Sequence, residues 1–410
     1  MTNPLCECPV AGYCKRHQMD KNETFHALCH GDRGQAGWKY FVAWESGKMG
    51  AVSPHDANTN PPAFEVDATT AGGVAACNGC GGSVSMPSVF DRIKSAAGAA
   101  AGFIADGMQV ASDSEREARQ SICKTCPLNE AGSCVGCGCV IELKTQARLE
   151  QCPAGRWFPE IRAAIPITDP IRNLIYHVLP VARNSNWKRN LDQLVLRQDL
   201  FNGKRVLAIA YEPRESGGGR IVPTVQPDEV LAYCDEIGMN WTDSRAFVND
   251  TNLGEVVSFP WLLETVKSTN PNELTFYAHA KGVTHSDNHT TVKWAERQYR
   301  VCLDDWAAVQ RALEQYSIVG SFRRFGEFAT PGNHRWHFSG TFYWFRNDAV
   351  FSRIWNKVDR LYFGVEAWPG KMFKPEESAC LFADNAGGMY LETEWEKLQR
   401  QIDVWEVARR

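Results

Sequence analysis

The chain lacks several features that would place it in a class at once. Its net charge is −4, so it lacks the positive excess that drives non-specific binding to nucleic acids. Its longest bland apolar run, Ala96 to Ala105, has about half of the roughly 20 residues that a membrane helix needs. No basic segment followed by an apolar one opens the sequence, as a secretory signal would require. These absences predict a cytoplasmic protein without a transmembrane segment.

Cysteine is scarce in the larger part of the chain. Of the 15 cysteines, 12 lie in residues 1–152 and only 3 in residues 153–410. In a reducing compartment, clustered cysteines are more often metal ligands than disulfides. The asymmetry predicts small cysteine-rich modules followed by one large domain. We expect a Cys/His-rich module at 1–48, a Gly/Pro/Asn-rich linker with a C-x2-C pair at 49–86, a helix at 87–120, a six-cysteine module at 121–165 and the large domain at 168–410.

The six-cysteine module has the spacing of metal ligands. Its cysteines are Cys123, Cys126, Cys134, Cys137, Cys139 and Cys152. They form two C-x2-C pairs, and four thiolates complete a tetrahedral zinc site. We expect structural zinc here, either one ion on four thiolates or two ions that share bridging thiolates; the ligand type also suits an iron–sulfur cluster. The arrangement resembles short cysteine modules of phage and bacterial proteins, and that resemblance implies no activity.

A second candidate metal site lies near the start of the sequence. Its expected ligands are Cys8, Cys14, His17 and Cys29. Cys14 and His17 have ligand spacing, but several other sets of four ligands exist in the same segment. The bland alternative is a tail with reactive thiols. Neither cysteine-rich segment contains an H-E-x-x-H motif, so we expect zinc to be structural rather than catalytic.

The large domain alternates strand and helix patterns, which predicts an α/β fold with a mostly parallel sheet flanked by helices. The expected strands are 173–181, 204–211, 244–250, 273–282 and 337–348. The expected helices are 186–201, 227–238, 258–267, 291–316 and 349–358. Ligands of such sheets bind at the carboxyl ends of the strands, so motifs at strand ends are candidates for a site.

Five short motifs follow one another in this domain: NLGEVVSFPWLL (252–263), FYAHAKG (276–282), GTFYWFRNDAV (340–350), EAWPG (366–370) and KPEESACLF (374–382). Their order resembles the GT-A class of nucleotide-sugar glycosyltransferases. Within that class it is similar to the rhamnan-synthesis-type enzymes of bacterial cell-surface polysaccharides. The resemblance covers about residues 170–395. It implies a GT-A-like, Rossmann-related fold, a nucleotide-sugar donor and transfer of a hexosyl or related sugar.

The resemblance also implies site residues. The catalytic candidates are His279, Lys281, Glu366 and Glu376. The donor-binding candidates are Pro180, Asp250, Asn252, Glu255, Gly340, Thr341 and Trp344. The chain lacks the D-x-D pair with which the class commonly holds Mg²⁺ or Mn²⁺ on the donor diphosphate. The nearest string is Asp250-Thr251-Asn252, which leaves the need for such an ion open.

The chemistry of glycosyl transfer explains these residue types. Negative charge builds up on the departing diphosphate and must meet a metal or cationic side chains. His279 and Lys281, two residues apart on a strand, can point into one cleft. A carboxylate such as Glu366 can accept the acceptor's proton. Each type also has a structural interpretation: His279 and Trp344 as core residues, and Glu376 as a first-turn acid.

The leading hypothesis is therefore sugar transfer to an acceptor that the sequence does not identify, whether glycan, protein or nucleic acid. In it, the zinc modules serve scaffolding or acceptor recruitment. The alternative is a zinc-dependent protein that binds nucleic acid or another protein, with an α/β domain that is non-catalytic or modifies nucleic acid. Its support is a basic set near Trp157, composed of Lys144, Arg148, Arg156 and Arg162.

Overall fold

The computed structural model describes residues 12–14, 19–21, 86–88, 109–160, 164–213, 223–284, 289–325 and 336–409. The chain divides into two compact units, Met1–Gly79 and Cys80–Arg410. In the first unit, β1 (Gly12–Cys14) and β2 (Met19–Lys21) pair antiparallel, with Cys14 opposite Met19. The other expected ligands of the first metal site, Cys8, His17 and Cys29, lie outside the described residues.

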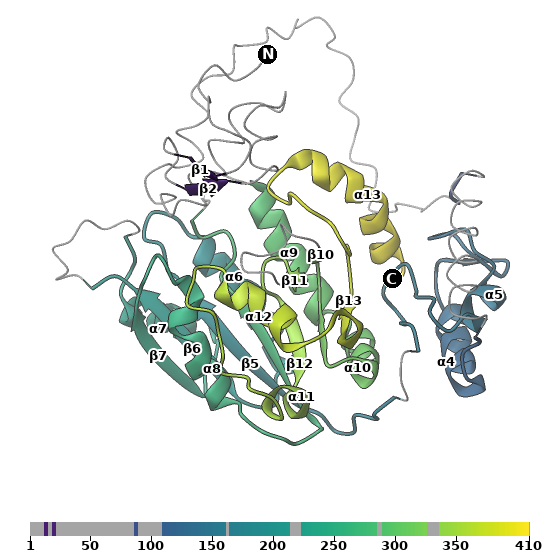
Figure 1. Cartoon of the computed structure of the whole chain (residues 1–410), viewed down its shortest axis with the longest axis horizontal. Helices are drawn as coiled ribbons and strands as arrows, with labels where there is room; N and C mark the ends of the chain where they lie inside the picture. Colours follow the sequence, from purple (N-terminus) through teal and green to yellow (C-terminus); the bar gives the residue numbers. More distant parts are fainter. Residues whose placement is uncertain are drawn as a thin grey trace, which may run out of the picture. The chain divides into compact units, whose positions relative to one another are not determined.

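A seven-stranded sheet organises the second unit (Figure 1). The strands follow the order β13-β9-β12-β8-β5-β6-β7, and only β12 runs antiparallel to its neighbours. Their bounds are β5 (Ile171–Val178), β6 (Arg205–Tyr211), β7 (Asp243–Val248), β8 (Glu273–His279), β9 (Ile318–Gly320), β12 (Tyr343–Arg346) and β13 (Ser378–Cys380). The predicted α/β fold with a mostly parallel sheet is confirmed.

Helices cover both faces of the sheet because alternate side chains of the central strands are apolar on both sides. In β5, Leu174 and Tyr176 join the larger core, whereas Ile175 joins the smaller one. The larger core packs against α6 (Asn186–Val195), α7 (Pro227–Ile237), α9 (His289–Leu303) and α10 (Trp306–Gln315). The smaller core packs against α8 (Phe259–Thr265), α11 (Asn347–Phe351) and α12 (Gly364–Met372). Among the described residues, no helix has the length and apolar character needed to span a membrane.

Two elements expected from the sequence are interrupted. The helix expected at 291–316 is α9 followed by α10, because Asp305 caps α10 by accepting a hydrogen bond from the amide of Ala308. The strand expected at 337–348 is divided by a turn in which Gly340 and Thr341 have φ of 90° and 62°. Before this turn, β11 (Trp336–Phe338) pairs with β10 (Arg323–Phe325); after it comes β12.

The six-cysteine module contains α4 (Asp113–Lys124), β3 (Asn129–Glu130), β4 (Ser133–Cys134) and α5 (Ile141–Gln146). Of the helix expected at 87–120, residues 89–108 lie outside the described residues. Residues 113–120 are helical in α4, which begins after Ser112, its cap, and continues into the cysteine segment. So small a module has little apolar core. At its centre lies the fully buried Arg119, whose guanidinium donates hydrogen bonds to four backbone carbonyls and stacks 4.9 Å from the ring of Trp157.

The module is joined to the C-terminal helix α13 (Glu392–Val407). Val404 and Ala408 complete its small core with Leu128 and Trp157. Arg409 donates to the carbonyl of Ala154 at 2.9 Å, and Arg156 and Arg400 bridge the same interface. The expected division near residue 165 therefore lies inside one compact unit.

Replacing Val404 with Asp should loosen both partners of this interface. A carboxylate buried without a partner is expected to lower the free energy of unfolding by about 3 kcal/mol or more. Urea unfolding followed by tryptophan fluorescence measures the loss, and limited proteolysis should cut first within residues 109–160. Leu196→Asp is the control, because Leu196 is 75% exposed and its replacement should change stability by no more than about 0.5 kcal/mol. Equal stability of the two variants would contradict the packing described.

Candidate functional site

The winding of the sheet reverses between β5 and β8. From β5 the chain builds β6 and β7 on one side, and then returns to place β8 on the other. Ligands of such sheets bind outside the carboxyl ends of the strands at this reversal. His177 of β5 and His279 of β8 are neighbours in the parallel register at these ends.

A carboxylate–imidazole pair lies at this edge. Glu255, in the single turn η3 (Gly254–Val257), contacts His279 Nδ1 through Oε1, and its Oε2 accepts a hydrogen bond from the Tyr277 hydroxyl at 3.3 Å. Burial by itself would raise the pKa of Glu255, but His279, His177 and Lys281 lower it to about 2. The second ring nitrogen of His279, Nε2, is buried and has no hydrogen-bond partner among the described residues. The pair therefore presents one ring nitrogen to a ligand.

His177 is the third polar side chain at this reversal. Its Nδ1 lies 2.8 Å from the hydroxyl of Ser258, which follows η3. Burial lowers the pKa of His177 to about 4, against the opposite effect of Glu255. The imidazole of His177 is therefore neutral at pH 7.

Lys281 extends the site beyond the end of β8. Its ammonium lies 4.0 Å from the ring centroid of Trp294 in α9 and 5.8 Å from that of Tyr390. Its charge helps to lower the pKa of Glu255 and also that of His337, whose pKa burial lowers first. Lys281 thus stands within electrostatic reach of two different histidine–glutamate pairs.

The second pair is Glu366 and His337. Glu366 Oε1 lies 3.4 Å from His337 Nε2, and the amide of Gly340 donates to the same oxygen at 3.3 Å. The other ring nitrogen of His337 is buried without a partner among the described residues. The turn that carries Gly340 is held by Gln298, which donates to the carbonyl of Ser339 at 2.9 Å and would clash with a Cβ at Gly340. Only glycine fits there at φ 90°.

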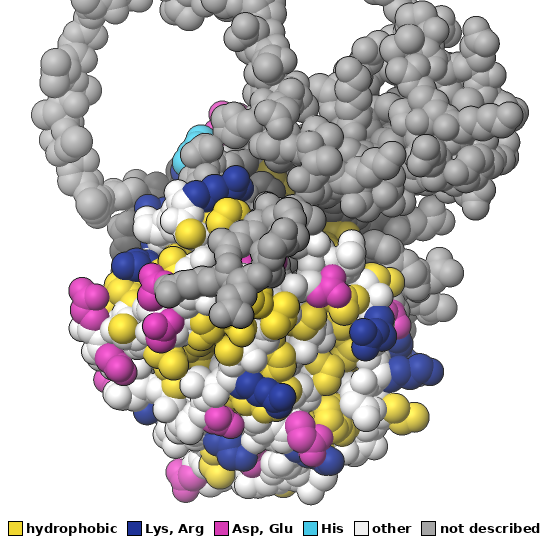
Figure 2. Space-filling model, turned by 90° about the vertical axis from the view of Figure 1, so that its left-hand side faces the viewer, with side chains coloured by type: hydrophobic (Ala, Val, Ile, Leu, Met, Phe, Trp, Pro, Cys, Tyr) yellow, Lys and Arg dark blue, Asp and Glu magenta, His cyan; other side chains and the backbone are white. Residues whose placement is uncertain are grey.

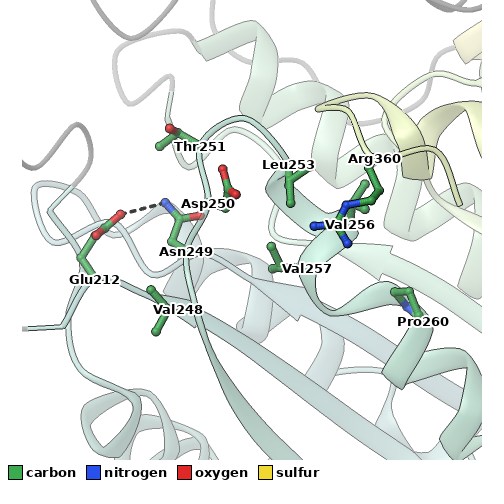
Figure 3. Close-up of a pocket in the computed structure, with 10 residues that line it drawn as sticks. All are labelled: Glu212, Val248, Asn249, Asp250, Thr251, Leu253, Val256, Val257, Pro260 and Arg360. Atoms are coloured by element: carbon green, nitrogen blue, oxygen red, sulfur yellow. Dashed lines mark hydrogen bonds between the residues drawn. The ribbon is translucent and has the colours of Figure 1, made fainter.

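A pocket of about 680 Å³ opens beside the first pair, at the carboxyl ends of β6 and β7 (Figure 3). Glu212 and Asn249 lie on one side, joined by a hydrogen bond of 3.1 Å, and Arg360 reaches in from the opposite side. The remaining lining residues are Val248, Asp250, Thr251, Leu253, Val256, Val257 and Pro260. The turn η3 both walls this pocket and carries Glu255, so pocket and pair are parts of one arrangement.

Some residues predicted from the sequence serve the fold instead of this edge. Trp344 is fully buried, stacks on Phe201 and donates its indole N–H to a backbone carbonyl. Because successive side chains of β12 face opposite sides of the sheet, the side chain of Trp344 points into the larger core and away from a nucleotide-sugar donor. Glu376 is exposed and precedes β13, so it lies at the opposite edge of the sheet from His279. We therefore leave Trp344 and Glu376 out of the site.

The remaining donor candidates lie at the expected edge but in different roles. Asp250 lines the pocket, and its carboxylate accepts a hydrogen bond from the amide of Asn252, whose own side chain is exposed. Pro180 is buried just after β5, and its carbonyl accepts from Val225. Thr341 is buried beside Gly340 with the positive φ already described, a conformation that a β-branched residue rarely adopts.

Five polar residues of this edge were not predicted as site residues: His177, His337, Glu212, Asn249 and Arg360. For three of them, the sequence contains a pattern that could have identified them. His177, Glu212 and Asn249 lie at or just after the ends of apolar strands, where the rule for parallel sheets places ligands. The sequence contains no such pattern for His337 and Arg360, because only the folding of distant segments brings them to this edge.

Four of the six module cysteines line one small cavity together with Lys144: Cys123, Cys126, Cys134 and Cys152. The indole of Trp157 donates to the sulfur of Cys123 at 3.4 Å. Burial raises the pKa of Cys152 to about 11. Within the part of the chain that the structure describes, no three Cys, His, Asp or Glu side chains stand ready to share one metal ion.

Two residues of the basic set expected near Trp157 take part in internal contacts. Lys144 is largely buried and pairs with Glu150, and Arg156 donates to the carbonyl of Ala408. Arg162 lies outside the described residues. Figure 2 shows the side of the molecule away from α4 and α5, and on that face Lys and Arg side chains are interspersed with Asp and Glu. The expectation of nucleic-acid binding stays a prediction.

Comparison with known proteins returns no relative: no family model matches the chain, and neither does any curated protein. The site therefore has to be interpreted from its own chemistry.

His177 predicts a loss of stability in mild acid. The folded pKa of about 4 lies below the ordinary 6.5, so between these values only the unfolded chain gains a proton at this residue. The free energy of unfolding should therefore fall as pH drops through this window, by up to about 3 kcal/mol. His177→Asn should lose less stability than the wild type between pH 7 and pH 4.5 in urea titrations. His289→Asn is the control, since 71% of that side chain is exposed; a wild-type-like loss in His177→Asn would contradict the assignment.

Proposed function

We propose that the protein is a glycosyltransferase that transfers a sugar from a nucleotide-sugar donor to an acceptor. One observation carries the proposal: a pocket large enough for a nucleoside shares the turn η3 with a half-buried carboxylate–imidazole pair, next to Lys281, at the carboxyl edge of an α/β sheet. The ordered motifs of the sequence, which resemble the GT-A class, support it. The GT-A likeness of the sheet is part of the same proposal.

The pocket would hold the nucleoside. Its volume of about 680 Å³ lies within the usual range for small-molecule sites. Glu212 and Asn249 offer oxygen acceptors on one wall for N–H groups of a base or hydroxyls of a ribose. Arg360 offers a guanidinium on the facing wall, which suits a phosphate.

Lys281 and His279 would meet the charge of the leaving group. When the bond between the anomeric carbon and the phosphate oxygen breaks, the electron pair leaves with the nucleoside diphosphate. In a site that contains little water, a cation stabilises this developing negative charge far more than it would in bulk solvent. Glu255 orients His279 so that Nε2 faces away from the carboxylate. Whether Mg²⁺ or Mn²⁺ also binds the diphosphate stays a prediction of the resemblance.

Glu366 would take the proton of the acceptor. The acceptor oxygen forms the new bond to the anomeric carbon while its hydrogen passes to the carboxylate. The Gly340 amide and His337 hold that carboxylate in place from two directions. The two histidine–glutamate pairs would thus have different roles. Glu255–His279 would act on the leaving group, and Glu366–His337 would act on the acceptor.

Lys281→Met tests the leaving-group role. The substitution keeps most of the aliphatic length and removes the charge, so kcat should fall by about 10²- to 10³-fold. Release of nucleoside diphosphate from UDP-, GDP- and dTDP-sugars is the measurement. Lys357→Met removes an exposed lysine from the loop after α11 and should leave kcat unchanged. Equal rates in the two variants would remove Lys281 from the mechanism, and absence of binding to all three donor classes would overturn the proposed function.

We also propose that the six-cysteine module binds zinc as a structural ion. Four of its thiols already line one cavity, and Lys144 lies beside them, where its charge can offset part of a thiolate cluster. The module has only a small apolar core, which α13 completes, so a bound metal ion would add folding free energy that this core does not supply. The ion would therefore support the second unit and take no part in transfer.

Metal analysis of the purified protein should find at least one zinc ion per chain. Cys152→Ser should lower this content and the thermal stability, because Cys152 lies at the centre of the module's core. Cys234→Ser is the matched control, since Cys234 is a buried cysteine of α7 in a different core. A protein that is free of zinc yet fully stable after purification without chelators would rule the ion out.

A further inference from the structure

A buried asparagine of α6 holds the backbone of Lys281. Asn190 is only 4% exposed. Its side-chain amide donates to the carbonyl of Lys281 at 3.0 Å, and its side-chain oxygen accepts from the amide of the same residue at 3.2 Å. The side chain thus pairs with both polar backbone groups of Lys281, as a neighbouring strand would.

The amide of Asn190 is satisfied at every position. Its second N–H donates to the carbonyl of Asn186 at 2.8 Å, and its oxygen also accepts from the hydroxyl of Tyr299 at 3.1 Å. A primary amide has two donor hydrogens and two acceptor sites, and all four are used here. Burying a polar side chain merely to fill space would cost free energy, and an apolar residue would fill the space without that cost. An asparagine here therefore indicates that the direction of its hydrogen bonds matters.

The clamp extends on both sides of Asn190. Tyr299 is itself held by Tyr176 of β5, with 2.9 Å between the two hydroxyl oxygens. Asn186 donates to the carbonyl of Gly282 at 3.0 Å, and Asn184 donates to that of Val283 at 2.7 Å. Three successive carbonyls after the end of β8 therefore accept from side-chain amides instead of continuing the sheet.

We propose that Asn190 is a positioning residue, which fixes the Lys281 ammonium at the distance from the leaving diphosphate that transfer requires. This inference rests on the proposed function. Glu255 holds His279 from the side of α8, and Asn190 holds Lys281 from the side of α6. The side chains of His279 and Lys281 at the strand end are thereby oriented independently from opposite faces of the sheet.

Asn190→Asp is the sharpest test, because Asp has the same shape, keeps the acceptor and loses both donor bonds. We expect kcat to fall about 10- to 100-fold, since a displacement of about 1 Å can cost that much, while KM for the donor changes little. In the double variant Asn190→Asp/Lys281→Met, kcat should be no lower than in Lys281→Met alone, because Asn190 acts only through that ammonium. Tyr299→Phe removes one donor and should cost only about two- to fivefold.

Asn240→Ala is the matched control, since Asn240 is exposed and bonds only locally to the carbonyl of Gly238. Additive losses in the double variant, or a loss confined to the yield of folded protein with kcat intact, would overturn the positioning role. Hydrogen exchange of the amides of 281–283 gives a readout that does not depend on transfer. In folded Asn190→Ala, which also removes the acceptor of the Lys281 amide, faster exchange of that amide supports the clamp even if no donor is turned over, and unchanged exchange overturns it.

Discussion

A half-buried carboxylate at the reversal of the sheet is the constraint on which the site depends. Burial raises the pKa of Glu255, and the neighbouring His279, His177 and Lys281 lower it to about 2, with His279 in direct contact. The pairing fixes η3 against the end of β8. Because η3 is also a wall of the pocket, the position of that wall and the orientation of His279 cannot change separately.

The strand end after His279 is shaped by polar side chains from both faces of the sheet. Side-chain amides of α6 and of Asn184, which precedes it, donate to the carbonyls of residues 281–283 beyond the end of β8. Across the edge, the turn at Gly340 and Thr341 aims a backbone N–H at Glu366, at the cost of a positive φ at a β-branched residue. Such strain persists only where the surroundings impose it, and it concentrates at functional sites.

The six-cysteine module is a structural part of the second unit rather than an appendage. Gly155, with φ 65°, passes so close to the carbonyl of Leu381 that a Cβ would lie 2.5 Å from it. Helix α13 supplies the module's missing apolar residues. Tyr390, immediately before that helix, lies near Lys281, so the chain runs directly from the site to the module's interface.

Local pattern was sufficient for the class of the fold and for one half of the site. Period-two apolar runs determine strands whatever their partners are, and His279 and Lys281 follow such a run, so their place at a carboxyl edge was predictable. Three features were not predictable from local pattern: the break at Asp305, the turn at Gly340 and the core role of Trp344. Contacts between distant segments decide where a helix is capped, where backbone strain is tolerated and which of two apolar faces a side chain joins. The same holds for the partners of the catalytic candidates. Glu255 faces His279, Glu366 faces His337 and Asn190 clamps Lys281 only after residues 24 to 91 positions apart have packed together, and no spacing in the sequence records such a distance.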